Sequence, residues 1–273
     1  MLLKKEFQIP QNGDTAYAVV TGASQGLGRA FAEELARNNI NMILTSLPGQ
    51  ELSSLSTELS SQYNVQVLCY ETDLSVNENV IDFATWINNS FSVFMLINNA
   101  GTGGSRKFEE ATPDYINTII QVNVMATSLL THQLLLNLKK QEKSYILNVS
   151  SMAAFCPIGY KTVYPASKAF VHSFSRGLYE ELKHTNVFVS VVNPGAMKTS
   201  EEITRRIEKQ GFLGKLTLLD PDAVARYSIK QLLKRDTVIM VNRMSWLMLN
   251  ILPIWIKLPL LTRTIKRELN IGL

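Results

Sequence analysis

Residues 17–28 read Tyr17-Ala-Val-Val-Thr-Gly-Ala-Ser-Gln-Gly-Leu-Gly28, a short apolar run followed by a turn with three glycines. The run is typical of a strand buried on both faces of a parallel sheet. The apolar spacing that follows predicts a helix over residues 27–38. A glycine-rich turn alone is weak evidence, because glycine also serves turns that need a positive φ. Between a buried strand and a helix, however, it brings backbone N–H groups and a helix N-terminus to a phosphate, so we expect a nucleotide there.

The same alternation of short apolar runs and amphipathic stretches continues along the chain. Further strands are predicted at residues 41–46, 65–71, 93–98, 145–150, 187–193 and 237–241, and helices at residues 50–62, 78–89, 112–138, 163–184 and 222–234. Such β/α repeats predict one α/β domain over residues 1–273, a doubly wound parallel sheet of about seven strands with helices on both faces. Ligands of such sheets bind beyond the carboxyl ends of the strands.

Composition narrows the classes of function. The 273 residues are 46% hydrophobic and 18% charged, which excludes intrinsic disorder. The 27 basic and 23 acidic residues are unevenly placed, since residues 200–273 hold 13 basic and seven acidic side chains. No run of Lys and Arg interleaved with aromatic residues occurs, so we expect no nucleic-acid partner.

The termini and cysteines bear on the cellular compartment. The first 14 residues are too polar for a signal peptide, which favours a cytoplasmic protein. Two cysteines, Cys69 and Cys156, make neither a disulfide framework nor a Cys-based zinc site, so we expect a reducing compartment and no metal.

Two segments depart from the β/α rhythm. Residues 199–219 are polar and basic with two glycines, and we interpret them as a helix–loop insertion. Residues 244–261 are apolar but interrupted by Asn250, Pro253, Lys257 and Pro259, which argues against a membrane span. The basic excess lies in the same region, so residues 242–273 form an apolar and basic C-terminal extension.

Three motifs occur in an order that resembles the short-chain dehydrogenase/reductase family. They are Thr-Gly-Ala-Ser-Gln-Gly-Leu-Gly at 21–28, Asn-Asn-Ala-Gly at 98–101, and Tyr164-x3-Lys168. The resemblance covers about residues 15–200. It implies a Rossmann-type fold and hydride transfer between NAD(P) and a carbonyl group or secondary alcohol. It also makes residues 199–219 the expected substrate lid.

The candidate catalytic residues are Asn123, Ser151, Tyr164 and Lys168. Tyr164 and Lys168 are four residues apart on a predicted helix, so they share one face. A tyrosine pKa near 10 is too high for acid–base work at neutral pH, and a nearby ammonium is expected to lower it. Ser151 follows the fifth strand and can hydrogen-bond a substrate oxygen, and the resemblance favours it over Ser150. The resemblance also implies that Asn123 holds a water molecule in a proton relay and that Lys168 hydrogen-bonds the nicotinamide ribose.

Each of these residues also has a plain structural explanation. A Tyr-x3-Lys pair is usually an ordinary pair on a helix surface. A serine after a strand usually belongs to a turn or caps a helix. An asparagine in an apolar helix is usually a buried amide with its hydrogen bonds satisfied. Their occurrence together behind a nucleotide turn favours catalysis. The alternatives are a catalytically silent nucleotide-binding redox sensor and a membrane-surface scaffold.

The resemblance implies further cofactor contacts: Asp73 at the adenine, residues 99–101 along the adenosine, and Thr199 at the carboxamide. As an alternative, Asp73 caps the next helix. The full predicted set is Gly22, Ser24, Gln25, Gly26, Leu27, Gly28, Ser46, Asp73, Leu74, Asn99, Ala100, Gly101, Tyr164, Lys168, Pro194, Gly195, Met197 and Thr199.

The choice between NADP and NAD depends on the end of the second strand. Residues 45–48 hold no carboxylate to bind a ribose 2′-hydroxyl. The basic residues that NADP users of the family show at the positions of Leu47 or Gln25 are also missing. Arg29 is near, however, and Ser46 can hydrogen-bond a phosphate. We therefore expect NADP rather than NAD.

The substrate and partners are expected to be apolar in character. Met197 and residues of the lid and of the loop after the fifth strand suggest an apolar pocket: Phe155, Pro157, Ile158, Ile203, Phe212 and Leu213. We expect a lipophilic small-molecule substrate, such as a long-chain ketone, an oxoacyl compound or a steroid. The C-terminal extension is a wall over the active site, a subunit contact, or an amphipathic element for peripheral membrane contact. A homodimer or homotetramer is expected.

Overall fold

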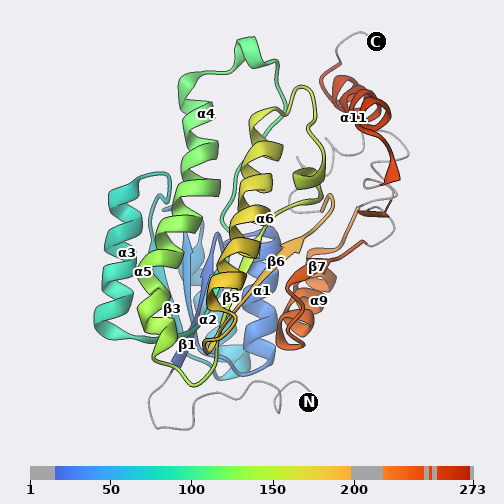
Figure 1. The fold of residues 1–273 in the computed structure, drawn as a ribbon. Coiled ribbons are helices and arrows are strands. Elements are labelled where there is room, and N and C mark those ends of the chain that lie inside the picture. Colours follow the sequence, from blue (N-terminus) through green and yellow to red (C-terminus); the bar gives the residue numbers. More distant parts are fainter. Residues whose placement is uncertain (1–15, 198–217, 243–245, 248–250, 271–273) are drawn as a thin grey trace.

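The computed structural model describes residues 16–197, 218–242, 246–247 and 251–270. Its centre is a seven-stranded sheet in the order β3-β2-β1-β4-β5-β6-β7, with every neighbouring pair parallel (Figure 1). The strands are β1 (Ala16–Thr21), β2 (Met42–Ser46), β3 (Val67–Glu71), β4 (Ser92–Asn98), β5 (Ser144–Val149), β6 (Val187–Asn193) and β7 (Val238–Met240). The predicted doubly wound, Rossmann-type sheet is confirmed.

Helices cover both faces of the sheet. One face packs against α1 (Gly26–Arg37), α2 (Leu52–Tyr63) and α9 (Pro221–Leu233). The other packs against α3 (Asn77–Ser90), α5 (Thr127–Lys139) and α6 (Val163–Leu182). The inner strands are buried on both sides because each layer of helices presents an apolar face to them, whereas β3 at the edge of the sheet is only partly buried. The two ends of every predicted strand and helix lie within three residues of the ends of observed elements.

The predicted helix over residues 112–138 is present but is not uniform. It consists of α4 (Pro113–Ile120), a π-helical segment η3 (Gln121–Ala126) and α5. A π turn holds more residues than an α turn and often occurs at functional sites. Periodicity alone does not reveal it, because apolar residues continue through the segment.

The rod formed by α4, η3 and α5, Pro113–Lys139, is long and apolar enough to cross a membrane by length and composition. Its C-terminal part packs against the sheet through Leu130, Leu134 and Leu138, which are fully buried. A core helix meets the same criterion, and the packing identifies this rod as one.

The C-terminal helix α11 (Ile254–Glu268) was not predicted. Pro253 and Pro259 were interpreted as interruptions of an apolar run, but Pro253 is the N-cap residue and Pro259 lies inside the helix. Proline at an N-terminal cap costs no hydrogen bond. Pro259 is the sixth residue of α11, past the first turn, so it leaves the helix without one i→i−4 hydrogen bond. Figure 1 shows α11 at the periphery, apart from the central sheet.

Two isoleucines of α3 test the assignment of its buried face. Ile87 is fully buried, whereas Ile81 on the same helix is 41% exposed. We expect Ile87→Ala to lower the free energy of unfolding by about 2–5 kcal/mol, because it leaves a cavity against the sheet. Ile81→Ala is the matched control and should stay within about 0.5 kcal/mol of the parent. Urea unfolding measures both, and equal losses would contradict this packing.

Candidate functional site

The glycine-rich turn after β1 is held in close contact with the end of β4. Gly22 has a φ of +64°, and a Cβ there would lie 2.9 Å from the Cα of Ala100. A Cβ on Gly28 would collide with the carbonyl oxygen of Gly22. Both positions therefore require glycine for steric reasons. The first turn of α1 consequently begins directly beside the carboxyl ends of β1 and β4, where the strand order reverses.

Thr21 and Asn99 join these two strand ends by reciprocal hydrogen bonds. The Thr21 hydroxyl accepts from the backbone N–H groups of Asn99 at 3.0 Å and Ala100 at 2.9 Å. The Asn99 side-chain amide donates to the carbonyl oxygens of Thr21 at 2.9 Å and Gly22 at 3.1 Å. Thr21 is the first residue of the motif at 21–28, but no contact of its hydroxyl was predicted. A hydroxyl at the last position of a buried apolar strand was the signal for this role.

Lys168 lies at the bottom of the candidate site. Its side chain is only 4% exposed, and Nζ donates to the carbonyl oxygen of Val149 at 2.8 Å. A Cβ added to Gly101 would lie 3.1 Å from this Nζ and 3.3 Å from Oδ1 of Asn123. The ends of β4 and β5, the π segment and α6 therefore meet around the lysine.

Tyr164 lies one helical turn before Lys168, and its ring centre is 6.0 Å from Nζ. Its surroundings raise its pKa, because burial disfavours the phenolate, while a hydrogen bond with Ser151 works in the opposite direction. Tyr164 as a whole is half-buried. The expectation that Lys168 lowers the pKa of Tyr164 is therefore wrong in this structure. The lysine is itself desolvated, and burial lowers its pKa to about 8.

The two serines after β5 have different surroundings. Ser150 is buried, and its hydroxyl donates to the carbonyl oxygen of Lys168 at 2.8 Å. Ser151 is half-buried, and its Oγ accepts from the N–H of Ala153 at 3.1 Å, where the short helix η4 (Met152–Phe155) begins. Ser150 thus braces α6, while Ser151 is the serine that meets Tyr164.

Asn123 lies in the π segment and connects three elements. Its Oδ1 accepts from the N–H of Thr102 at 2.8 Å, and its amide donates to the carbonyl oxygen of Thr102 and to Oγ of Ser167, both at 2.9 Å. Both amide hydrogens are thus used within the protein. The loop after β4 also touches the tyrosine, since a Cβ on Gly103 would lie 2.5 Å from Cδ2 of Tyr164. Sequence analysis missed Gly103, although the Gly-Gly pair at 103–104 was a signal of close approach.

The adenosine side of the predicted cofactor site lies at the ends of β2 and β3. Ser24 donates to Oε1 of Gln50 at 2.6 Å, which ties the glycine-rich turn to the start of α2. Ser46 is buried at the end of β2. Arg29 is paired with Glu33 and Glu58, each at 3.0 Å, so its charge is already compensated.

Two other predicted cofactor residues have structural contacts of their own. Oδ1 of Asp73 accepts from the N–H of Ser75 at 2.8 Å. This bond closes a turn before α3, whose N-cap is Val76, so Asp73 does not cap that helix directly. Leu27 and Leu74 have buried side chains, so only their backbones can face a ligand.

The end of β6 closes the site on its other side. The carbonyl oxygen of Pro194 accepts from Met152 N–H at 2.9 Å. Met197 forms an isolated parallel bridge with Leu219, so the two ends of the predicted lid lie side by side. Thr199, Ile203, Phe212, Leu213 and most of the 199–219 lid lie outside the described residues.

The C-terminal helix contacts the loop between Ser151 and Tyr164. The N–H of Gly159 donates to Oγ1 of Thr262 at 3.0 Å, and Nζ of Lys257 lies 3.4 Å from the carbonyl oxygen of Phe155. A Cβ on Gly159 would come within 2.7 Å of Thr262 Cγ2. One face of α11 thus lies against the loop that joins Ser151 to Tyr164.

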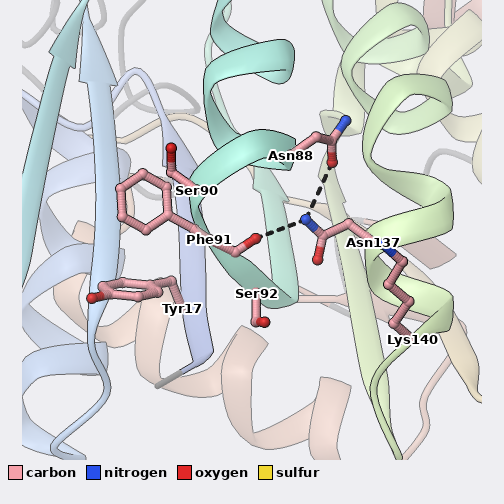
Figure 2. A pocket seen from close by; sticks show the side chains of 7 residues that line it. All are labelled: Tyr17, Asn88, Ser90, Phe91, Ser92, Asn137 and Lys140. Carbon is pink, nitrogen blue, oxygen red and sulfur yellow. Dashed lines mark hydrogen bonds between the residues drawn. The ribbon is translucent and has the colours of Figure 1, made fainter. Parts of the chain in front are cut away.

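A separate cavity of about 470 Å³ opens at the opposite edge of the sheet (Figure 2). Its lining comes from the starts of β1 and β4 and the ends of α3 and α5: Tyr17, Asn88, Ser90, Phe91, Ser92, Asn137 and Lys140. The side-chain amide of Asn137 uses its N–H groups there within the protein, because it donates to the carbonyl oxygen of Phe91 and to Oδ1 of Asn88. Ser151, Tyr164 and Lys168 lie at the carboxyl edge, so this cavity is not the candidate catalytic site.

Comparison with known proteins gives consistent relatives. The family model described as short chain dehydrogenase matches residues 16–210. The "Very-long-chain 3-oxoacyl-CoA reductase" of Anas platyrhynchos is 35% identical over 201 residues, which cover 72% of this chain and 64% of that protein. The chain thus spans less than two thirds of that relative's length.

Two further similarities extend over more of the chain. The protein of the same name from Rattus norvegicus is 32% identical over 250 residues, covering 88% of this chain and 76% of the rat protein. Among solved structures, a short-chain dehydrogenase from Sphingobium yanoikuyae in complex with NADPH is 26% identical with a TM-score of 0.76. That similarity covers 86% of this chain and 92% of the other.

The burial of Lys168 predicts a pH-dependent stability. Its pKa falls from 10.5 to about 8 on folding, so at neutral pH the folded protein holds an ammonium that is better solvated in the unfolded chain. Between pH 8 and 10.5 the unfolded chain binds more protons, so this residue's contribution to the free energy of unfolding rises with pH. At a given pH in this window, the slope is at most about 1.4 kcal/mol per unit.

Lys168→Met removes this contribution. Relative to the variant, the parent protein should therefore gain roughly 2–3 kcal/mol of unfolding free energy between pH 7 and 10. Urea titrations at both pH values measure the difference, with Lys139→Met, an exposed lysine on α5, as the control. A parent–variant difference that does not change with pH would show that the lysine is not desolvated.

Proposed function

Because the chain belongs to the short-chain dehydrogenase family, we propose that it is an oxidoreductase that transfers hydride between NADP(H) and a carbonyl group or secondary alcohol. One observation carries the proposal. Ser151, Tyr164 and Lys168 converge at the carboxyl edge of the sheet, beside a glycine-rich turn in which side chains are sterically excluded. Ligands of doubly wound sheets bind at this edge, and the turn supplies a helix N-terminus for a pyrophosphate.

Ser151 is proposed to hold the substrate oxygen. Its Oγ accepts a hydrogen bond from Ala153, and its hydroxyl hydrogen-bonds Tyr164. A substrate oxygen that enters between the two hydroxyls would take up the hydrogen bond of Ser151 as it gains negative charge. Tyr164 is proposed to exchange the proton with the same oxygen. Since burial raises its pKa, Tyr164 is protonated at neutral pH, so it holds the proton that the substrate oxygen takes up when a carbonyl group is reduced.

Lys168 and Asn123 are proposed to assist Tyr164, Lys168 by exchanging a proton and Asn123 by positioning neighbouring segments. A lysine pKa of about 8 lets the amine hold or release a proton near neutral pH, and Lys168 lies one helical turn from the tyrosine. The side-chain amide of Asn123 is committed to Thr102 and Ser167. We therefore propose that its amide positions the loop after β4 and the start of α6, rather than holding a relay water itself.

NADP is the proposed cofactor, and it supplies the hydride. The turn fits a dinucleotide because Gly22 and Gly28 place no side chain of their own between its backbone and a phosphate. β2 itself ends without a carboxylate, and Ser46 supplies a hydroxyl there. The nearest carboxylate is that of Glu71 on β3, which pairs in register with Ser46 and accepts from the N–H of Gly49 at 3.3 Å. Arg29 does not contribute a free charge, because Glu33 and Glu58 already pair with it. The NADPH bound by the relative from Sphingobium yanoikuyae supports the same choice.

A long-chain 3-oxoacyl thioester is the proposed substrate class. The names of the duck and rat relatives support an oxoacyl group. The chain's own support is apolar: Phe155, Ile158 and Met197 lie partly exposed around the loop between Ser151 and Tyr164 and at the end of β6. Such side chains favour an alkyl chain over a small polar ketone.

The proposed setting is the cytoplasm, with the protein as a homo-oligomer. Cys69 and Cys156 are both free thiols, which suits a reducing compartment.

Two adjacent helices, α5 and α6, expose large apolar residues, with Leu136 74% and Phe170 41% exposed. Figure 1 shows these helices side by side on one face of the molecule, so a second copy of the chain could cover both.

Tyr164→Phe tests the mechanism. It removes only the hydroxyl, so we expect at least a hundredfold loss of kcat with little change in NADPH affinity, because proton transfer contributes about 10²–10⁴-fold. Tyr179→Phe on the same helix is the matched control and should keep the parental rate. Unchanged turnover in Tyr164→Phe would sink the mechanism. A parent protein that binds NADPH without turning over any carbonyl or alcohol would favour the redox-sensor alternative.

A substrate panel tests the cofactor and substrate classes together. We expect kcat/KM to rise with acyl chain length among 3-oxoacyl thioesters and to be higher with NADPH than with NADH, measured by nicotinamide absorbance. Each added methylene buried in an apolar pocket contributes about 0.8 kcal/mol, or roughly fourfold. Reduction of small polar ketones alone would refute the lipophilic substrate. A tenfold or larger preference for NADH would refute NADP.

Light scattering tests the oligomer. Leu136→Glu and Phe170→Glu should shift the protein toward the monomer, because each would bury an unpaired charge in the proposed contact. Ile81→Glu on α3 has a comparable exposure and should leave the mass unchanged. A monomeric parent protein, or variants with parental mass, would remove the proposed contact.

A further inference from the structure

The C-terminal helix α11 has one face turned to the protein. Thr262 receives the Gly159 N–H, and Ile265 and Glu268 are buried, 4% and 7% exposed. Leu258, Leu261 and Leu269 are half-buried on the same side. These positions recur three or four residues apart, which is the spacing of a single helix face. The helix is thus held in a fixed orientation on the loop that joins Ser151 to Tyr164.

The opposite face is apolar in its first half. Ile256 and Leu260 are exposed there, in line with Arg263 and Arg267 at the spacing of one helix face. In the first turn Ile254 and Trp255 are exposed as well, and Ile251 precedes them. Trp255 is 73% exposed and Ile251 69%. Soluble proteins rarely leave so many large apolar residues together in water, so a partner of some kind covers this face.

The second half of α11 is basic. Arg263 and Arg267 are exposed, and Lys266 is half-buried. Residues 251–270 hold four basic side chains and one acidic side chain, Glu268, which is buried. The outer surface of the helix therefore passes from apolar to cationic along its length.

This distribution decides between the possible partners. If a second copy of the chain covered the face symmetrically, the arginines of one copy would lie near those of the other, which costs free energy. An anionic lipid surface satisfies both halves, because acyl chains accept the apolar side chains and phosphates accept the arginines. Tryptophan also prefers the boundary between acyl chains and headgroups. The helix has 15 residues, about 22 Å, which is too short to span a bilayer.

We propose that α11 docks the protein on an anionic membrane surface. Trp255, Ile256 and Leu260 enter the boundary of the acyl chains, and Arg263 and Arg267 bind headgroup phosphates. The loop between Ser151 and Tyr164 then lies directly behind the docked helix, on the side of the protein that faces the lipid. The docking does not require the proposed reaction, but it would bring the site to a pool of lipophilic substrate.

Vesicle co-sedimentation of the full chain tests the docking. We expect binding to phosphatidylcholine vesicles that contain phosphatidylserine, weaker binding to phosphatidylcholine alone, and a decline with rising salt. Trp255→Glu should weaken binding at least tenfold, as loss of one buried aromatic side chain predicts. Arg263→Gln with Arg267→Gln should remove the preference for phosphatidylserine. Ile81→Glu, an exposed position on α3, is the control and should bind as the parent does.

A second measurement separates docking from folding and from catalysis. Brominated lipids should quench tryptophan emission in the parent protein and much less in Trp255→Phe. Trp255→Glu should keep parental turnover of a water-soluble carbonyl without vesicles, because Trp255 does not touch the catalytic residues. Loss of that turnover would mean that the variant reports on the fold, and the quenching result then decides. Equal vesicle binding by parent and Trp255→Glu, or a change of oligomer mass in Trp255→Glu without a change in vesicle binding, would overturn the proposal.

Discussion

The hydroxyl of Thr21 fixes the distance between the ends of β1 and β4. It accepts from two successive N–H groups of the Asn99–Ala100 turn, while the Asn99 side chain returns two hydrogen bonds to the turn after β1. Gly22 and Gly28 follow from this approach, because any side chain would strike the neighbouring backbone. The position of Gly101, and through it the space around Lys168, depends on the same contact.

The fold followed from the sequence because parallel strands and their covering helices have strong and distinct apolar patterns. The strand ending at Thr21 and the helix beginning at Gly26 are examples, since both are buried along the faces that their periodicity predicts. The π segment around Asn123 and the helix α11 could not be predicted from the sequence. The first continues the apolar pattern of its neighbours, and the second directs much of its apolar surface outward, so its pattern does not resemble that of a core helix.

The positions of the candidate site residues were easier to predict than their electrostatics. A Tyr-x3-Lys spacing on a helix places both side chains on one face, and the structure has both on α6. The sign of the pKa shift of Tyr164 depends on desolvation, which outweighs the hydrogen bond with Ser151, and neither effect can be read from spacing. Likewise, only the structure shows that Ser150 is committed to the backbone of Lys168 while Ser151 is not.

The π segment limits which mutations this part of the chain can accept during evolution. A π turn amounts to one residue more than a regular helix needs, so removing a single residue from 121–126 would let the rod become a continuous α-helix. The residues before the deletion would then rotate by about 100° relative to α5, which is anchored in the core by Leu130 and Leu134. Ile119 would leave its buried position, and the connection from Asn123 to Thr102 would break. Substitutions along the rod are therefore more easily accommodated than deletions, and the number of residues in this segment is itself under constraint.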